Sequence, residues 1–431
     1  MDKSLRWMAL AALSALMAWA APEPAAAGII IKRAYFSSLA AGNNHTCVLH
    51  NLVGSQQVLC WGANLAGQAG TTGGDPNNEN SVYAPVVVSG LASTVVQLTA
   101  GGDFTCALLS TGRAQCWGWG FEGQLGASGT GSSATPLDVG LAGMTQISAG
   151  DDHACALVGS NQDNVMPGVW CWGSNGYGQI DSAQPYTYPI GLTLVPLPMT
   201  PISVSAGRHF TCALLQDSIP APHTPPYCWG ENDIYAQLGD GATDSPTGPT
   251  PVSLLSLLYT GITLSPAMLG DCAQLTSGAE LCWGDNSVGE TGNGTYDPSL
   301  PPHPVTTPTL ISGATATVMA SGVERIANCS VMTYHGTNGL YCWGAVPYFQ
   351  GNNINGLDSP TLLPALTTGT PTDAVSLPSQ IVMGAGHVCA IAEVNDVASH
   401  VFCWGNNYYG QVGNGQGGPA GQALAPPVEI L

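Results

Sequence analysis

The chain has 431 residues, of which only 8% are charged, and its seven Lys and Arg residues stand against 27 Asp and Glu residues to give a formal net charge of −20. So few basic side chains cannot form a stripe along a phosphate backbone, and the negative field repels nucleic acids and anionic lipids. DNA and RNA are therefore excluded as natural partners. With so little charge, the 56 Gly and 32 Pro residues are typical of a turn-rich, all-β extracellular protein.

The first residues of the chain have the order of a secretory signal peptide. Basic residues near the start are followed by an apolar stretch from Trp7 to Ala21, and Ala25 and Ala27 supply the small residues before a cleavage site. We therefore predict a signal peptide over residues 1–27 and a mature chain over residues 28–431. The apolar stretch is too short for a comfortable bilayer span, so we expect secretion or release into a periplasm, with no membrane insertion after cleavage.

The 14 cysteines fall into seven pairs, and the second member of each pair is followed by Trp-Gly. The pairs are Cys47 and Cys60, Cys106 and Cys116, Cys155 and Cys171, Cys212 and Cys228, Cys272 and Cys282, Cys329 and Cys342, and Cys389 and Cys403. Successive C-W-G sequences lie roughly 57 residues apart, and a regular spacing of this size indicates an array of similar units.

Each unit contains several short runs of β-forming residues. In the second unit these runs are Pro85–Val88, Val95–Gly101, Cys106–Leu109 and Ala114–Gly118, rich in Val, Leu and Thr and separated by Gly or polar residues. Such runs predict strands, and no convincing helical pattern follows residue 28. Seven units of several strands predict a single all-β domain, a seven-bladed β-propeller, in which ring closure removes the exposed sheet edges.

The spacing of the cysteines predicts one disulfide in each blade. A turn centred on Thr111 would set Cys106 opposite Cys116 on antiparallel strands, close enough for a disulfide, while Trp117 would point to the other face. Metal ligation and redox catalysis are the alternatives, but there is no C-x-x-C and no Cys/His group at zinc spacing. An exported chain with an even number of cysteines favours structural disulfides and an oxidising compartment.

The repeat resembles that of the regulator of chromosome condensation family. The resemblance rests on Ala41–Cys47 (Ala-Gly-Asn-Asn-His-Thr-Cys) and on Trp404–Gly413 (Trp-Gly-Asn-Asn-Tyr-Tyr-Gly-Gln-Val-Gly), with related sequences across the predicted mature chain. It implies the propeller fold but leaves function open, because the family includes a nuclear nucleotide-exchange factor, a secreted β-lactamase inhibitor and many exported bacterial proteins. The predicted export, the disulfides and the acidic composition argue against nucleotide exchange here.

The resemblance also implies how the ring closes and where the repeat is weakest. The family's closure implies that residues 427–431 pair with the first blade beside residues near 29–36. The fifth and sixth units depart from the pattern at residues 268–272 and 322–329, where the Gly-x-x-His signature is missing. We expect these two blades to close the ring while presenting different loops.

The segments that follow the C-W-G sequences carry the candidate binding residues, because equivalent positions should project from one face of the disc. The aromatic residues there are Trp119, Phe121, Tyr177, Tyr235, Tyr348, Phe349, Tyr408 and Tyr409, and Leu65, Ile234 and Val288 hold related positions. Aromatic side chains dominate protein-binding hot spots and also stack on sugar rings. The alternative is that these rings only pack against neighbouring loops.

Two other sets of repeated residues are interpreted as structural. An amide or carboxyl side chain recurs in every unit, at Gln68, Gln124, Gln179, Gln237, Glu290, Gln350 and Gln411, and we expect it to tie a loop to the neighbouring backbone. His45, His153 and His387 occupy a position that holds Phe104 and Phe210 in two other units. A position that accepts either ring favours a packing role over a metal site or a catalytic base.

Acidic residues cluster at Asp151 and Asp152, at residues 231–233, and at Asp285 with Glu290. Calcium is considered for these loops, but no D-x-D-x-D-G spacing occurs, so we expect solvated loops and no metal or cofactor. No G-x-S-x-G, H-E-x-x-H or phosphate-loop motif occurs either, so we do not expect an enzyme.

The sequence therefore predicts an exported, monomeric interaction propeller that binds a protein of the cell envelope or exterior across one loop face. A glycan-binding propeller that uses the aromatic residues is the first alternative. A hydrolase or lyase at the mouth of the central channel is the second, and it would require titratable groups that converge there.

Overall fold

The structure is a computed structural model that describes residues 34–431 apart from several short segments. The segments left out are residues 127–130, 161–162, 182, 217–223, 254–261, 267–269, 276, 296–304, 322–326, 346–356, 369, 371, 396–397 and 419–424. The predicted signal peptide, residues 1–27, lies outside the described residues. Within the part of the chain that is described, no helix has the length and apolar character needed to cross a bilayer.

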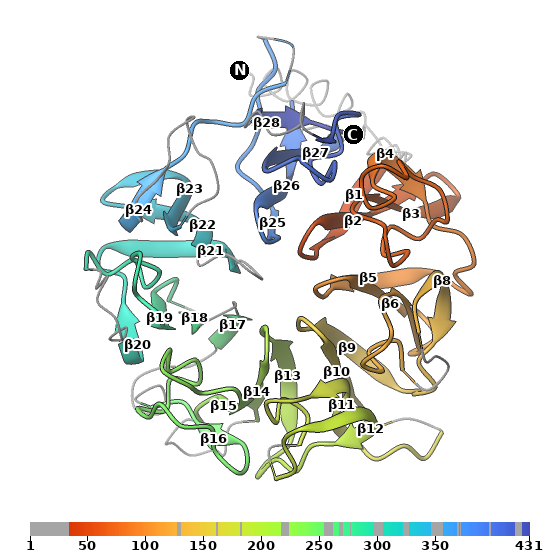
Figure 1. Ribbon diagram of the computed structural model, residues 1–431. Coiled ribbons are helices and arrows are strands. Elements are labelled where there is room, and N and C mark those ends of the chain that lie inside the picture. Colours follow the sequence, from red (N-terminus) through yellow and green to blue (C-terminus); the bar gives the residue numbers. More distant parts are fainter. Residues whose placement is uncertain are drawn as a thin grey trace, which may run out of the picture. The chain divides into compact units, whose positions relative to one another are not determined.

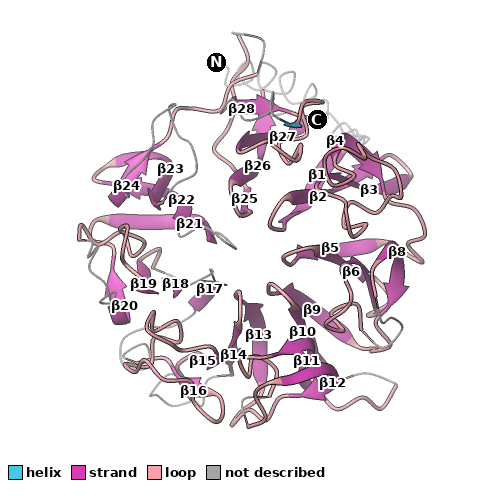
Figure 2. Cartoon of the chain, viewed as in Figure 1, coloured by secondary structure: helices cyan, strands magenta, loops and turns pink. Residues whose placement is uncertain are grey.

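The described residues form seven four-stranded antiparallel sheets, each built from four strands that are consecutive in sequence (Figures 1 and 2). Blades one to four contain β1 (Tyr35–Ala41), β2 (His45–Leu52), β3 (Ser55–Gly62), β4 (Val82–Val87); β5 (Val95–Ala100), β6 (Phe104–Leu109), β7 (Ala114–Gly118), β8 (Ser133–Asp138); β9 (Met144–Ala149), β10 (His153–Val158), β11 (Gly168–Asn175), β12 (Thr187–Leu194); β13 (Pro201–Ala206), β14 (Phe210–Leu215), β15 (Tyr227–Gly230) and β16 (Thr250–Pro251). Blades five to seven contain β17 (Ile262–Pro266), β18 (Gly270–Leu275), β19 (Glu280–Gly284), β20 (Val305–Leu310); β21 (Ala314–Ser321), β22 (Ala327–Tyr334), β23 (Thr337–Gly344), β24 (Leu357–Leu362); β25 (Gln380–Met383), β26 (His387–Val394), β27 (Ala398–Gly405) and β28 (Ala425–Glu429).

The seven sheets form a closed ring around a central channel. The first strand of each blade is innermost, and it contacts the first strands of both neighbouring blades, including β1 against β25 (Figure 1). A pocket of about 240 Å³ lies in this channel and is lined by Ala, Ser, Thr, Met and aliphatic side chains of these strands. None of the described residues that line it is titratable. The prediction of a seven-bladed β-propeller is confirmed.

Each blade carries one disulfide between its second and third strands, as the cysteine spacing predicts. In the second blade, Cys106 lies directly opposite Cys116, with Cα atoms 4.1 Å apart. The same pairing joins the other six pairs, and no described cysteine is free. The Trp after each second cysteine is fully buried and packs with the neighbouring blade; Trp117, for example, lies in a cluster with Leu49 and Val58 of the first blade.

Glycine is required at the last position of the C-W-G sequence, where the third strand of the blade ends. Gly118 has a φ of 106°, in the region that favours glycine. A Cβ atom there would lie 2.5 Å from the backbone oxygen of Asp103, in the turn between β5 and β6. Gly62 is held in the same way against Asn44 in the first blade. This contact keeps the third strand close to the turn beside it.

The structure corrects the division of the sequence into blades. The run Pro85–Val88 is expected to begin the second blade, but β4, which contains most of it, is the outer strand of the first blade and pairs with β3. Residues 63–81 loop back, so that Val86 lies opposite Cys60. The run follows its C-W-G strand closely in sequence, and antiparallel pairing with that strand requires only a local loop.

The expected pairing of residues 427–431 with the first blade is also wrong for the residues described. β28 pairs with β27, where Val428 lies opposite Cys403, and so completes the seventh blade. In the seventh blade, as in the first, the outer strand pairs with the C-W-G strand that precedes it in sequence. The described strands of these two blades are therefore not exchanged between them. The ring closes through side chains instead: the Phe36 N–H donates to Ser399 Oγ over 2.6 Å, and the Leu39 N–H donates to Gln380 Oε1 over 3.0 Å.

Candidate functional site

Two kinds of connection meet at one end of every blade. In the first blade these are the turn at residues 42–44, between β1 and β2, and the loop at residues 63–81, between β3 and β4. Because neighbouring strands are antiparallel, the hairpin between β2 and β3 lies at the opposite end. We call the first end the loop face and the second end the hairpin face. The six predicted aromatic binding residues that the structure describes belong to connections of the loop face.

A glutamine, or Glu290 in the fifth blade, ties one blade to the next in six of the loops. The Gln68 side-chain carbonyl accepts a hydrogen bond from the Ala66 N–H, and its amide donates to Asp103 of the second blade. The Gln68 backbone carbonyl accepts the indole N–H of Trp117 over 3.0 Å. Six blade interfaces have this indole-to-carbonyl bond, from Trp61 to Gln411, Trp117 to Gln68, Trp172 to Gln124, Trp229 to Gln179, Trp283 to Gln237 and Trp343 to Glu290. The structural interpretation of these residues is confirmed, with Gln350 outside the described residues.

The three signature histidines are also links between blades. His45 Nε2 lies 2.8 Å from Thr105 Oγ1, and His153 and His387 make the same contact with Thr211 and Thr46. Each ring is fully buried, and burial lowers the histidine pKa to about 3. The rings are therefore neutral at physiological pH, and their burial removes them from any ligand that approaches the loop face.

A phenylalanine replaces histidine in the second blade because its partner is different. Phe104 faces the third blade, where Ala154 stands in place of the threonine, and the two residues pack in one apolar cluster. A histidine there would have no hydroxyl to bond, and burial without a hydrogen bond is costly. The exchange of a polar pair for an apolar pair explains why this position accepts phenylalanine in the second blade.

Three of the predicted binding residues are exposed on the loop face. Trp119, Phe121 and Tyr177 expose 38%, 61% and 44% of their surface, which is unusual for such large apolar rings. Trp119 and Phe121 are in contact, with ring centroids 4.7 Å apart. Tyr177 stacks on His209 of the fourth blade at 4.2 Å. The second and third blades therefore present an aromatic surface to solvent.

The other predicted aromatic residues are less available or not described. Tyr408 and Tyr409 are half-buried and pack edge to face with centroids 4.9 Å apart, while the Tyr409 hydroxyl donates to Glu79 of the first blade. Tyr235 is half-buried among acidic groups. Tyr348 and Phe349 lie outside the described residues. Packing against neighbouring loops therefore accounts for part of the aromatic set.

Carboxylates lie among these aromatic residues. We name as the acidic arc the residues Glu79, Asp103, Glu122, Asp151, Asp152, Glu231 and Asp233, which follow the loop face from the first to the fourth blade. Burial raises the pKa of Asp152 to about 6, and the negative charge of Asp151 contributes further to this increase. The pKa of Asp103 is raised for the same two reasons, although its side chain is accessible to solvent.

Part of the arc has donor atoms that could hold a metal ion. Asp151, Asp152 and His209 each offer one ligand atom, and these atoms lie within 4.8 Å of one another. Asp151 already has protein partners, since the Asn43 amide donates to Oδ1 and the Arg208 guanidinium lies 3.6 Å from Oδ2. A divalent cation would have to displace that guanidinium. The donor set therefore fits an ion pair network at least as well as a metal.

The fifth blade carries two buried carboxyl groups in place of the usual polar pattern. Glu290 stands where other blades have glutamine, and burial together with the nearby Asp285 raises its pKa to about 8. The Ser287 hydroxyl lies within hydrogen-bond distance of both carboxylates. The departure of this blade from the repeat therefore produces a pair of carboxyl groups that holds a proton, where the sequence predicts a solvated loop.

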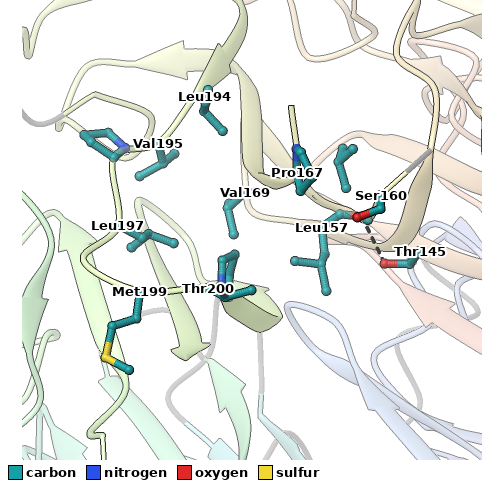
Figure 3. A pocket seen from close by; sticks show the side chains of 15 residues that line it. Thr145, Leu157, Ser160, Pro167, Val169, Leu194, Val195, Leu197, Met199 and Thr200 are labelled. Atoms are coloured by element: carbon teal, nitrogen blue, oxygen red, sulfur yellow. Dashed lines mark hydrogen bonds between the residues drawn. The ribbon is translucent and has the colours of Figure 1, made fainter. Parts of the chain in front are cut away.

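An apolar pocket lies on the hairpin face, at the opposite end of the strands from the aromatic residues. Its volume is about 480 Å³, and Leu157, Val169, Leu194, Leu197 and Met199 line it where the third blade meets the fourth (Figure 3). The lining is mostly aliphatic and contains no titratable side chain. No sequence signal marked this pocket, because its residues come from a hairpin and from a connection between blades.

Sequence reasoning missed the role of His209. It does not occupy the signature histidine position, but it stacks under Tyr177, and its Nδ1 lies 3.0 Å from Glu231 Oε2. These contacts join the third and fourth blades on the loop face. Only the alignment of His209 with Asn44, Asp103 and Asp152, one residue before the signature position, could have indicated it.

The chain matches known repeats and propellers along most of its length. One sequence model of the Regulator of chromosome condensation (RCC1) repeat matches residues 55–108 and 111–157, and a second matches residues 95–124, 144–179 and 379–411. The Ultraviolet-B receptor UVR8 of Arabidopsis thaliana is 27% identical over 88% of this chain and 78% of its own length. The human E3 ubiquitin-protein ligase HERC2 is 26% identical over 62% of this chain, which spans only 5% of that ligase.

Solved structures support the same fold. Human WBSCR16 has a TM-score of 0.68 at 19% identity, with 87% of this chain and 94% of that chain covered. Yeast RCC1 (Prp20), solved with Kap60 bound to it, has a TM-score of 0.65 at 17% identity, with 92% and 85% covered. At these identities the likeness establishes the architecture, and the binding described for the yeast protein is a property of that protein.

Proposed function

Because the chain belongs to the regulator of chromosome condensation repeat family, we propose that it acts as an exported binding propeller that engages a protein of the cell envelope or exterior through its loop face. Propellers of this repeat commonly mediate protein interactions, and the seven disulfides are consistent with an oxidising compartment. The observation that carries the proposal is the exposure of Trp119, Phe121 and Tyr177 on one face. Exposed aromatic side chains on a rigid frame are the usual anchors of protein interfaces.

Glycan binding is the second candidate, because Tyr177 stacks on His209, whose Nε2 lies 3.9 Å from Asp151 Oδ2. An aromatic ring next to hydrogen-bonding groups is the arrangement that stacks on a sugar and fixes its hydroxyls. Protein binding would spread contacts over several blades, whereas glycan binding would use separate shallow pockets. Binding as a monomer is part of the proposal.

The test compares the protein with two variants, each expressed as the full chain and purified with its disulfides intact. The first variant carries Trp119→Ala, Phe121→Ala and Tyr177→Ala on the loop face. The control carries Tyr35→Ala, Val53→Ala and Met166→Ala, which remove exposed apolar side chains near the hairpin face.

Both are tested against envelope proteins and a glycan array, and circular dichroism checks their folding. We expect the control to retain a ligand that the loop-face variant loses. The chemical class of that ligand decides between protein and glycan. If the two variants bind alike, the loop face is not the site.

A further inference from the structure

We propose that the acidic arc and the exposed aromatic rings form one docking surface for a cationic protein segment, one that presents several Lys or Arg side chains. This inference rests on the proposed function and names the chemistry of the partner. The surface extends over the first four blades of the loop face.

The first step is that five carboxylates of the arc, from the first three blades, form one electrostatic unit. The charge of Asp151 acts on both Asp103 and Asp152, Glu122 acts on Asp152, and Glu79 acts on Asp103. These residues come from three different blades, so the ring brings together charges that are distant in sequence. Such a group repels anions over a wide area and attracts cations.

The second step is that little positive charge compensates the arc. Among the basic residues described, Arg113 pairs with Asp138 over 3.0 Å, away from the arc. Arg208 is the one described Lys or Arg residue that approaches the arc, with its Nε 3.6 Å from Asp151 Oδ2, and His209 lies against Asp151 and Glu231. Most carboxylates of the arc therefore have no basic partner in the described chain, and a ligand can supply that charge.

The third step is that the aromatic rings lie within this field. The backbone N–H of Trp119 donates to the backbone carbonyl of Asp103, and Phe121 directly precedes Glu122. Tyr177 stacks on His209, whose Nε2 lies 3.9 Å from Asp151 Oδ2. An exposed ring next to carboxylates suits Lys and Arg, because the ring face attracts the cation and also covers its aliphatic stem.

The experiment uses a fluorescent twelve-residue peptide of alternating Lys and Ser, with an alternating Glu and Ser peptide as the reference. The arc variant carries Asp103→Asn and Glu122→Gln, which change the charge by +2 and let residue 103 keep accepting from Gln68. The matched control carries Asp163→Asn and Glu393→Gln, two exposed positions near the hairpin face. Both variants have the same net charge, so a general attraction to an acidic protein affects them equally.

We expect the Lys peptide to bind the wild type and the control with similar affinity, and the arc variant about fivefold more weakly, the size expected for two exposed charge pairs. Binding should weaken from 50 to 500 mM NaCl. Equal affinity for both variants, or no binding of the Lys peptide, overturns the inference. If the aromatic variant loses a captured partner and the arc variant keeps it, the proposed function is supported and the inference about the acidic arc is wrong.

Discussion

Glu280 is a carboxyl group in the hydrophobic core between the fifth and sixth blades. The equivalent positions of the other six blades hold Val58, Ala114, Val169, Pro226, Leu340 and Val401, and each of these is buried. Glu280 is fully buried, and its neighbour Ser330 donates its hydroxyl to Val318. Burial raises the pKa of Glu280 to about 8, so the group is largely protonated at neutral pH.

This burial predicts a stability that falls as pH rises. The folded state keeps the Glu280 proton up to about pH 8, whereas the unfolded state loses it near the ordinary value of 4.5. Between these limits the folded state binds more protons, so each pH unit removes up to about 1.4 kcal/mol of stability. We expect Glu280→Val to raise the free energy of unfolding at pH 8 by more than at pH 5, as measured by urea denaturation.

Glu393→Gln, which removes an exposed carboxyl, is the control and should leave the pH dependence of stability unchanged. If Glu280→Val has the same effect at both pH values, the side chain is ionised in the folded protein and the interpretation is wrong.

Replacing Glu290 by the glutamine of the other blades should also stabilise the protein in alkaline solution. The substitution Glu290→Gln keeps an oxygen to accept the Val288 N–H, a bond of 2.8 Å, and removes the repulsion from Asp285. We expect a gain of about 1 kcal/mol at pH 8 and little change at pH 5. Thermal denaturation at the two pH values measures it, and a loss of stability at pH 8 would show that the carboxylate has a favourable partner.

At the scale of the strands, neighbouring blades are joined by pairs of side chains, and both members of the pair can differ from one blade interface to another. His45 with Thr105 is a polar link, and Phe104 with Ala154 is its apolar equivalent. We expect His45→Phe to cost about 1 kcal/mol, because the Thr105 hydroxyl loses a partner. In a Thr105→Ala background the same change should cost less, and a double-mutant cycle by urea denaturation gives the coupling energy.

The absence of coupling in that cycle would mean that the two side chains contribute independently. Ser330→Ala is the control, because Ser330 lies in a different blade interface. Its effect on the free energy of unfolding should add to that of His45→Phe, with no coupling energy.

Strands and hairpins could be predicted from the sequence because their signals are local. Cys106 and Cys116 flank a single turn, so their register follows from the spacing alone. The blade to which a strand belongs could not be predicted in the same way. In sequence, Pro85 lies between the C-W-G strands of the first and second blades. The pattern of side chains around it fits pairing with either strand. The choice depends on the path of the loop at residues 63–81, which has no periodic signal.

The candidate site could be predicted only in part for a similar reason. The equivalence of the repeats placed Trp119, Phe121 and Tyr177 on one face, and all three are exposed there. The contacts of Tyr177 with His209 and of Asp103 with Gln68 depend on the rotation from one blade to the next. That rotation arises from the closed ring, and no short segment of sequence contains it.

For the whole molecule, the disulfides should contribute a large part of the stability. Removing one with Cys106→Ala and Cys116→Ala should cost roughly 2 to 4 kcal/mol, mainly because the unfolded chain gains freedom. The pair Cys155 and Cys171, separated by 16 residues rather than 10, should cost slightly more. Urea denaturation of both variants measures this, and equal stability with and without the bond would contradict the expectation.

Because each blade is built from one continuous stretch of sequence, the chain can be rearranged in units of whole blades. Every sheet uses four consecutive strands, and β28 stays with β27 rather than crossing to the first blade. A circular permutant that is opened in the connection between two blades and joined from residue 431 to residue 34 by a linker would keep all seven sheets intact. Duplication or loss of one gene segment would likewise add or remove a complete blade, with its disulfide and its buried tryptophan.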